Sequence, residues 1–200
     1  MPKLLIATNN AGKVWEFRQL LDGCGWELVT PADLGIALDV EETGQTYLEN
    51  ATMKAVAFAK ASGLTALADD SGLEVDALDG RPGILSARYA GPDLTDAERA
   101  GELLKELAGV PDEERTARFR CVIAIAKNED DVRSVEGTVE GRIAREPKGE
   151  NGFGYDPVFL LPGRELTAAE LTPDEKHAVS HRGVATRKAS KLLENMLHDD

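Results

Sequence analysis

A buried segment that leads into two adjacent aspartates constrains this 200-residue chain more than any other feature. The apolar run Leu64–Ala68 is followed directly by Asp69, Asp70, Ser71 and Gly72. Because side chains alternate between the two faces of a strand, the two carboxylates should point in opposite directions. Ser71 and Gly72 are typical of a turn, so we expect the strand to end here, where open α/β sheets bind ligands. An ordinary strand exit has the same composition, so the rest of the chain must decide.

The composition is that of a globular protein with a substantial core. Hydrophobic residues make up 42% of the chain and charged residues 30%. We expect a single α/β domain with two lobes over residues 1–200. No apolar run approaches the roughly 20 residues that span a bilayer, and the first apolar stretch is too short for a signal peptide. Cys24 and Cys121 form no CxxC pair, which indicates two reduced structural thiols. These features predict a cytoplasmic protein without a membrane partner.

The net charge of −13 excludes one class of partner. A general nucleic-acid surface needs many lysine and arginine contacts to phosphates, so no nucleic-acid partner is expected. A small phosphate ligand is compatible with this charge if local cations, a helix N-terminus and a divalent metal overcome the repulsion.

The N-terminal segment offers such an anion site. Lys3–Ala7 is predicted as a buried strand, and a helix is predicted from about Gly12 to Leu21. The loop between them consists of Thr8, Asn9, Asn10, Ala11, Gly12 and Lys13. Backbone N–H groups and the helix dipole at such a loop attract anions, and Lys13 adds a full charge. A plain strand-to-helix turn with a solvated lysine explains the segment equally well, because the P-loop motif is absent.

A second helix carries Lys54. Thr46-x-x-Glu49 has the capping-box pattern, and Gly63 ends the helix after Ser62. Glu49 therefore has a structural explanation as the capping partner. The loop before this helix contains Glu41 and Glu42.

The middle of the chain predicts a mixed sheet. A third helix spans 95–108, and a strand over 117–125 grades from polar alternation into an apolar run. A turn at 128–131 returns the chain as an antiparallel strand over 132–139. We therefore expect a mixed α/β fold with a long central sheet and flanking helices.

Two later stretches carry candidate ligand groups. In 149–157, glycines frame Phe153, Tyr155 and Asp156, a composition that favours a ligand loop over a structural hairpin. Lys176, His181 and Arg182 form a small cationic cluster that suits phosphates or a base. His177 and His181 are spaced i, i+4, but HExxH fails and no third ligand is evident, so zinc is not expected.

Five ordered blocks resemble those of the inosine triphosphate pyrophosphatase family, also called the Ham1-like or non-canonical purine NTP pyrophosphatases. In order they are TNNAGK (8–13), EETG (41–44) with YLENA (47–51) and KA (54–55), ADDSGL (68–73), GFGYDP (152–157) and SHRG (180–183). They span nearly the whole chain. One departure is Asn9, where the family usually has glycine. Asparagine tolerates a positive φ better than other non-glycine residues, so we expect the turn to survive.

The resemblance implies an enzyme that uses Mg²⁺ to hydrolyse ITP, dITP and XTP to the monophosphate and pyrophosphate. It also implies a fold of two lobes around a cleft, usually as a homodimer. By position, Asp70 would be the general base and a metal ligand, and the further metal ligands would be Glu42, Asp69 and Glu41. The implied substrate-binding residues are Thr8, Asn9, Asn10, Ala11, Gly12, Lys13, Lys54, Ser71, Phe153, Gly154, Tyr155, Asp156, Lys176, His181 and Arg182.

Two other functions stay open at this point. One is a related pyrophosphatase that acts on pyrimidine or modified nucleotides. The other is a nucleotide-sensing module without hydrolysis, in which the same loops bind phosphate and the carboxylates only hold metal. Pyrophosphate release from ITP, XTP, dUTP and ATP separates all three.

Overall fold

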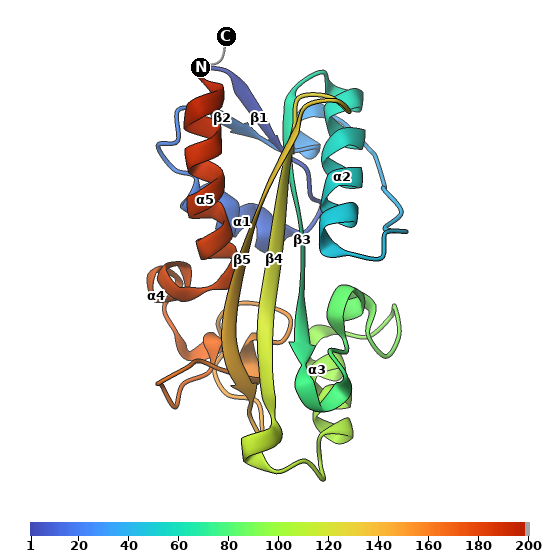
Figure 1. Ribbon diagram of the computed structural model, residues 1–200, viewed down its shortest axis with the longest axis vertical. Coiled ribbons are helices and arrows are strands. Elements are labelled where there is room, and N and C mark those ends of the chain that lie inside the picture. Colours follow the sequence, from blue (N-terminus) through green and yellow to red (C-terminus); the bar gives the residue numbers. More distant parts are fainter. Residues whose placement is uncertain (199–200) are drawn as a thin grey trace. The chain divides into compact units, whose positions relative to one another are not determined.

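The computed structural model describes residues 1–198 and has a mixed α/β fold (Figure 1). Its six strands form one sheet in the order β2-β1-β3-β4-β5-β6. The strands are β1 (Lys3–Ile6), β2 (Glu27–Val29), β3 (Thr65–Val75), β4 (Thr116–Ala126), β5 (Val132–Ile143) and β6 (Phe159–Leu160). The helices are α1 (Ala11–Leu20), α2 (Tyr47–Ser62), α3 (Asp96–Glu106), α4 (Pro173–Val179) and α5 (His181–Met196). The predicted fold class is confirmed.

The sheet combines parallel and antiparallel pairs, as predicted. β1 pairs in parallel with both β2 and β3, and β5 pairs antiparallel with β6. β4 and β5 are joined by a turn in which the Lys127 N–H donates to the Asp131 carbonyl at 3.0 Å. So short a connection joins only antiparallel strands. Among residues 1–198, no helix has the length and apolar character needed to cross a bilayer.

The strand that carries the two aspartates is longer than predicted. β3 continues to Val75, so the expected turn at Ser71 and Gly72 is wrong. Leu73 and Val75 are fully buried, and the Leu73 N–H donates to the Ser86 hydroxyl at 2.8 Å. Burial of these apolar side chains outweighs the local turn preference of Ser-Gly. Asp69 and Asp70 therefore lie within β3 and not at its end.

Helix boundaries follow their capping residues. Thr46 accepts a hydrogen bond from the Glu49 N–H, as predicted for α2. The return contact differs from a capping box, because Glu49 accepts from the N–H of Gln45 at 2.6 Å. α4 is an additional helix that we did not predict, although Thr172 and Glu175 form a complete capping box at its start.

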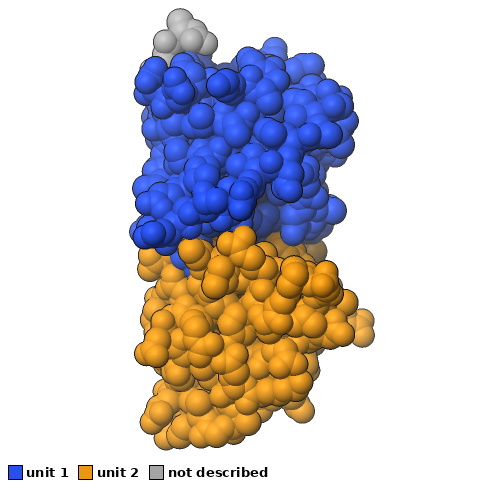
Figure 2. Space-filling view, turned by 90° about the vertical axis from the view of Figure 1, so that its right-hand side faces the viewer, with its two compact units in different colours: residues 1–70, 121–137, 182–200 blue, residues 71–120, 138–181 orange. Residues whose placement is uncertain are grey.

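The chain divides into two compact units, coloured separately in Figure 2. Unit 1 contains 1–70, 121–137 and the residues from 182 onward, and unit 2 contains 71–120 and 138–181. Each unit has its own apolar core. The core of unit 2 includes Leu73, Leu103 and Phe159. The single domain with two lobes stays a prediction.

In unit 1, helices cover both faces of the sheet. One core joins Phe17 of α1, Leu67 of β3 and Leu193 of α5. α2 buries Ala51, Ala55 and Phe58 and is absent from that core. Figure 1 shows α2 and α5 on opposite sides of β3. A polar residue of β3 can therefore face either α1 and α5 or α2, according to its position in the strand.

Candidate active site

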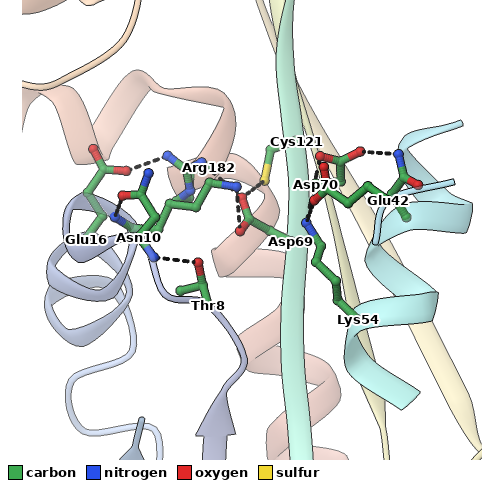
Figure 3. Close-up of polar contacts among 11 residues, drawn as sticks. Thr8, Asn10, Glu16, Glu42, Lys54, Asp69, Asp70, Cys121 and Arg182 are labelled. Atoms are coloured by element: carbon green, nitrogen blue, oxygen red, sulfur yellow. Dashed lines mark hydrogen bonds and ion pairs between the residues drawn. The ribbon is translucent and has the colours of Figure 1, made fainter. Parts of the chain in front are cut away.

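Asp69 and Asp70 project from opposite faces of β3 (Figure 3). This confirms the prediction made from strand alternation. Asp69 points toward Arg182 and Cys121, whereas Asp70 points toward Lys54 and Glu42. Two carboxylates that are adjacent in sequence thus enter two different polar clusters, and every member of both clusters belongs to unit 1.

Asp69 is the fully buried centre of an ion-pair cluster. Its Oδ1 lies 3.0 Å from Lys13 Nζ, and its Oδ2 accepts from Arg182 Nη2 at 2.9 Å. The Cys121 thiol lies 3.7 Å from the same Oδ2. Arg182 in turn donates from Nη1 to Glu16 at 2.6 Å, so its guanidinium is held between two carboxylates. The β3 strand is thereby tied to α1 and α5.

The charges around Asp69 stabilise its ionised form. Burial alone would raise the pKa of Asp69, but the nearby charges of Lys13 and Arg182 hold it well below the ordinary value of 3.8. Burial would likewise lower the pKa of Arg182, and Asp69 raises it far above the ordinary value. Burial raises the pKa of the Cys121 thiol, which therefore stays protonated. Asp69 and Arg182 therefore stay charged near neutral pH.

Asp70 belongs to a more accessible cluster on the α2 face. Lys54 Nζ donates to Glu42 Oε1 and lies 3.9 Å from Asp70 Oδ1. The Asn50 side chain donates from Nδ2 to Asp70 Oδ2 at 3.1 Å. The side chain of Glu42 is 26% exposed and that of Asp70 is 7% exposed, so solvent reaches this pair but not Asp69, whose side chain is 0% exposed.

The pKa of Asp70 shifts in the opposite direction to that of Asp69. Burial raises it above 3.8, Lys54 lowers it, and the nearby Glu42 charge raises it further. Burial would lower the pKa of Lys54, but Asp69 and Asp70 raise it, so Lys54 stays charged. A carboxylate whose pKa is raised is a better proton acceptor, which is the property that a general base requires. Asp70 therefore has the electrostatic environment of a base and Asp69 does not.

The loop before α1 presents a helix N-terminus beside the Asp69 cluster. α1 begins at Ala11, and its N-cap Asn10 accepts from the Lys13 N–H at 3.0 Å. The Asn10 N–H donates to the Thr8 hydroxyl at 3.2 Å. Within residues 1–198, positive φ angles outside glycine occur at Asp79 and Ala90, so Asn9 does not need the left-handed conformation. Exposed N–H groups and Lys13 at this helix start suit an anionic ligand.

The predicted metal ligands are brought together only in part. Glu42 and Asp70 share Lys54, whereas Asp69 is turned to the other face of β3, and Glu41 is exposed. Within the described residues, no group of three or more His, Cys, Asp or Glu side chains is arranged to hold a metal ion. Two carboxylates still fit Mg²⁺, which is usually held by one or two carboxylates together with waters and substrate phosphates.

The charge balance also fits an added cation. The two clusters hold four carboxylates and three cationic side chains, which leaves one negative charge. A polyphosphate would be repelled by this excess, and a divalent cation would reverse its sign.

The remaining predicted residues lie mostly in unit 2. Lys176 Nζ donates to Asp156 Oδ2 at 2.6 Å, and both side chains are buried. The same ammonium lies 5.0 Å from the centre of the half-buried Phe153 ring, and the Phe153 N–H donates to Asp156 at 2.9 Å. The His181 ring stacks on the Phe119 ring, with 4.7 Å between the two ring centres. Lys176, Asp156 and Phe153 thus form a third polar cluster, which contains one ammonium, one carboxylate and one aromatic ring.

Three other predicted residues have simpler surroundings. Tyr155 is buried in the core of unit 2 and donates to the Ser86 carbonyl at 2.9 Å, so it is a packing residue there. The Gly154 N–H donates to Asp96 at 2.7 Å. Ser71 is half-buried and follows Asp70 on β3.

Three residues of the unit 1 clusters were not among the predicted site residues: Glu16, Asn50 and Cys121. Glu16 follows Lys13 by three residues, so the two share a face of α1. That spacing could have placed Glu16 beside Lys13 from the sequence alone. Asn50 lies in the first turn of α2, where a polar residue is usually explained by the helix end. The sequence did not indicate a polar role for Cys121, because this residue occupies an apolar position of a buried strand.

The fold and these clusters define a class: a mixed α/β protein that places a helix N-terminus, two lysines and the carboxylates of Glu42 and Asp70 around one strand. Comparison with known proteins narrows this class to a family. The model of the Ham1 family matches residues 4–192, and the chain belongs to this family.

Relatives of known name match over nearly their full length. The dITP/XTP pyrophosphatase of Bacillus subtilis is 50% identical over 194 residues, which cover 97% of this chain and 98% of that protein. The dITP/XTP pyrophosphatase of Escherichia coli O157:H7 is 49% identical over 197 residues, covering 98% and 100%. Among solved structures, a HAM1 protein from Coxiella burnetii superposes with a TM-score of 0.89 at 46% identity, covering 98% of this chain and 100% of the other.

Proposed function

We propose that this chain is a nucleoside triphosphate pyrophosphatase that hydrolyses non-canonical purine nucleotides, namely ITP, dITP and XTP, to the monophosphate and pyrophosphate. The relatives named dITP/XTP pyrophosphatase support this substrate class. The observation that carries the reaction type is the Asp70 carboxylate, which has a raised pKa and lies beside Glu42 and Lys54. Hydrolysis removes such nucleotides from the nucleotide pool.

Asp70 acts as the general base in this proposal. A water attacks the α-phosphorus, Asp70 accepts its proton, and the bond from that phosphorus to the α,β-bridging oxygen breaks. The raised pKa of Asp70 increases its affinity for that proton. Lys54, which stays charged, stabilises the negative charge that develops on the phosphates.

The triphosphate is assigned to groups of unit 1. The N–H groups at the start of α1, the Thr8 hydroxyl and the Lys13 ammonium are the donors on one side of β3. The Asp69 carboxylate holds Lys13 in place and is itself held by Arg182. Asp69 thus serves as a fixed support for Lys13.

Magnesium is the cofactor that we propose for this reaction, with Glu42 and Asp70 as its protein ligands. When bound, it neutralises phosphate charge and polarises the phosphoryl oxygens for attack. The proposal rests on the hard oxygen donors of the pair and on the negative charge left in the two clusters.

The proposed preference for inosine and xanthosine nucleotides rests on hydrogen-bond chemistry. Hypoxanthine and xanthine carry a 6-oxo acceptor where adenine carries an amino donor. Lys176 has only donors, so an adenine amino group placed against it would leave both groups unsatisfied, a penalty of about 1–3 kcal/mol for each group. Phe153 offers a ring face for stacking. We therefore assign base recognition to Phe153, Lys176, Asp156 and His181.

A substrate panel tests the proposed function. Pyrophosphate release is measured with ITP, XTP, dUTP and ATP in the presence of Mg²⁺. We expect rapid release from ITP and XTP and slow release from dUTP and ATP. Preferred release from dUTP would instead indicate a pyrimidine-directed enzyme. Binding of ITP without release from any of the four would indicate a nucleotide-sensing module.

Two further properties stay predictions. The homodimer that the resemblance implies is tested by light scattering on the purified chain. The cytoplasmic location is tested by fractionation of cells that express it.

A further inference from the structure

Asn50 links the Asp70 carboxylate to the backbone of the segment that carries Glu42. Neither the sequence nor the resemblance gave it a role. It is fully buried in the first turn of α2. Its Nδ2 donates to Asp70 Oδ2 at 3.1 Å, and its Oδ1 accepts from the Gly44 N–H at 2.8 Å. One carboxamide therefore bridges β3 and the segment 41–44, which carries Glu42.

The chemistry of the bridge requires an amide. A backbone N–H such as that of Gly44 can only donate, and an ionised carboxylate such as that of Asp70 can only accept. A carboxamide presents one acceptor and donors on opposite sides and satisfies both neighbours at once. A carboxylate at position 50 would satisfy Gly44 and repel Asp70, and an apolar side chain would satisfy neither.

The bridge fixes the orientation of the Asp70 carboxylate. Asn50 contacts Oδ2, while Lys54 lies 3.9 Å from Oδ1. Because the two oxygens face different partners, rotation of the carboxylate would break both interactions. The water-activating group of the proposed reaction is held in one rotamer as a result.

The bridge also fixes the segment that carries Glu42. A Cβ added to Gly44 would lie 2.6 Å from Asn50 Oδ1 and 2.7 Å from Glu49 Cβ, so the backbone approaches the helix as closely as glycine permits. The next N–H, that of Gln45, donates to Glu49 at 2.6 Å. Gly44 is two residues from Glu42, and Glu42 is ion-paired with Lys54 of the same helix.

We propose that Asn50 is a positioning residue that sets the spacing between the Asp70 carboxylate and the Glu42 segment, so that both carboxylates are presented together to one divalent cation. This inference rests on the proposed function, because it concerns the same carboxylates. Asn50 acts through Asp70 and Gly44 and takes no part in proton transfer.

Three variants separate the two ends of the bridge. Asn50→Asp keeps an acceptor for Gly44 and loses the donor to Asp70. Gly44→Ala keeps the donor to Asp70 and displaces the Glu42 segment. Asn50→Leu removes both contacts at similar volume. The matched controls are Asn195→Asp, at an exposed position of α5, and Gly101→Ala in α3, where an added Cβ meets nothing within 4 Å.

Two measurements are made on every variant. The first is steady-state ITP hydrolysis over a range of Mg²⁺ concentrations, which gives kcat, KM and the half-saturating Mg²⁺ concentration. The second is calorimetric titration of Mg²⁺ into protein saturated with α,β-imido-ITP, which reports metal affinity without turnover. Urea unfolding in metal-free buffer measures the stability of each variant separately.

We expect Asn50→Leu to lower kcat and Mg²⁺ affinity by about 10- to 100-fold each, as is typical for loss of a group that orients a metal ligand. KM for ITP should change little, because Lys13 and the α1 N-terminus are untouched. Asn50→Asp should mainly lower kcat, and Gly44→Ala should mainly weaken Mg²⁺ binding. Both controls should match the wild type.

The outcomes distinguish the inference from the function on which it rests. An active wild type, together with folded variants that keep its kcat and its Mg²⁺ affinity, would overturn the inference alone. Loss of stability in Asn50→Leu and Gly44→Ala without any change in the calorimetric Mg²⁺ affinity would also overturn it, because Asn50 would then be merely structural. A wild-type chain that releases no pyrophosphate from any nucleotide overturns the proposed function, and the inference with it.

Discussion

Asp69 and Asp70 are neighbours in the chain, but their surroundings shift the pKa values of the two carboxyl groups in opposite directions. Asp69 faces Lys13 and Arg182, which stabilise its charge, whereas Asp70 is buried near the charge of Glu42. The strand itself causes this separation, since neighbouring residues face opposite sides. One carboxylate is thereby used for support, and the other is left with an environment suited to proton transfer.

The two aspartates should respond to neutralisation with opposite changes in stability. Asp69→Asn removes one partner from a buried ion-pair cluster and should lower the free energy of unfolding by about 3–5 kcal/mol. Asp70→Asn replaces a carboxylate whose ionisation is disfavoured in the folded state, so it should raise stability in metal-free buffer. Urea denaturation of both variants at pH 7 measures this. Equal destabilisation by the two substitutions would contradict the assignment of their environments.

The contribution of Asp69 should also depend on pH. Its pKa in the folded chain lies below the ordinary 3.8, so the folded state favours the ionised form. Its stabilising effect is complete above that ordinary value and is lost as the pH falls toward the folded pKa. The stability difference between wild type and Asp69→Asn should therefore be constant from pH 7 to pH 5 and should shrink below about pH 3.8. Acid titration followed by circular dichroism tests this, and a difference that shrinks already above pH 5 would refute it.

At the scale of elements, a buried arginine joins three segments of unit 2. Arg115 is 2% exposed and donates to the carbonyls of Leu107, Ile143 and Ala144 at 2.6, 2.8 and 2.7 Å. These carbonyls belong to the end of α3 and to the end of β5 and the residue after it. A planar fork of N–H groups suits several acceptors at once, which a single ammonium does not.

Replacement of this arginine should destabilise the chain. Arg115→Met leaves the three carbonyls without their donor and should lower the free energy of unfolding by about 3 kcal/mol or more, at about 1–3 kcal/mol per buried group. Arg142→Met, at an exposed position of β5, is the matched control. Urea unfolding compares the two. Equal stability of the two variants would show that Arg115 does not hold these segments together.

The elements could be predicted from the sequence where local signals and burial agree. The Thr95 and Glu98 capping box marks the start of α3, and the Thr46 N-cap marks that of α2. β3 was predicted too short because Ser71 and Gly72 have a strong turn preference, while the burial of Leu73 is a tertiary effect. Local preference and packing conflict there, and packing decides.

The candidate site could be predicted only where it depends on residues that are close together in the sequence. Strand alternation was enough to separate Asp69 from Asp70, because it depends only on neighbouring residues. The partners of each aspartate come from segments far apart in sequence, such as Arg182, which is 113 residues from Asp69. No spacing rule connects such positions, so the ion-pair cluster around Asp69 required the structure.

At the scale of the whole molecule, the chain crosses repeatedly between its two units. The unit boundaries at 70, 120 and 137 fall within β3, β4 and β5, so each of these strands contributes to both units. Separate cores therefore share continuous strands, and loss of one core removes the support of strand segments in the other. Cooperative unfolding is the expected consequence.

This cooperativity can be measured because both tryptophans, Trp15 and Trp26, lie in unit 1. Tryptophan fluorescence reports that unit, and far-ultraviolet circular dichroism reports the secondary structure of the entire chain. We expect the two urea transitions to coincide in midpoint and slope. A fluorescence transition displaced from the dichroism transition would show that the units unfold separately.

The central claim is that Asp70, with Glu42 and Lys54, forms the catalytic centre of a pyrophosphatase. Product analysis of ITP hydrolysis by the wild type and by Asp70→Asn, each with Mg²⁺, tests it most directly. The wild type should yield IMP and pyrophosphate in equal amounts, and the folded Asp70→Asn variant should yield neither at a measurable rate. Formation of IDP and phosphate by the wild type, or undiminished pyrophosphate release by Asp70→Asn, would contradict the claim.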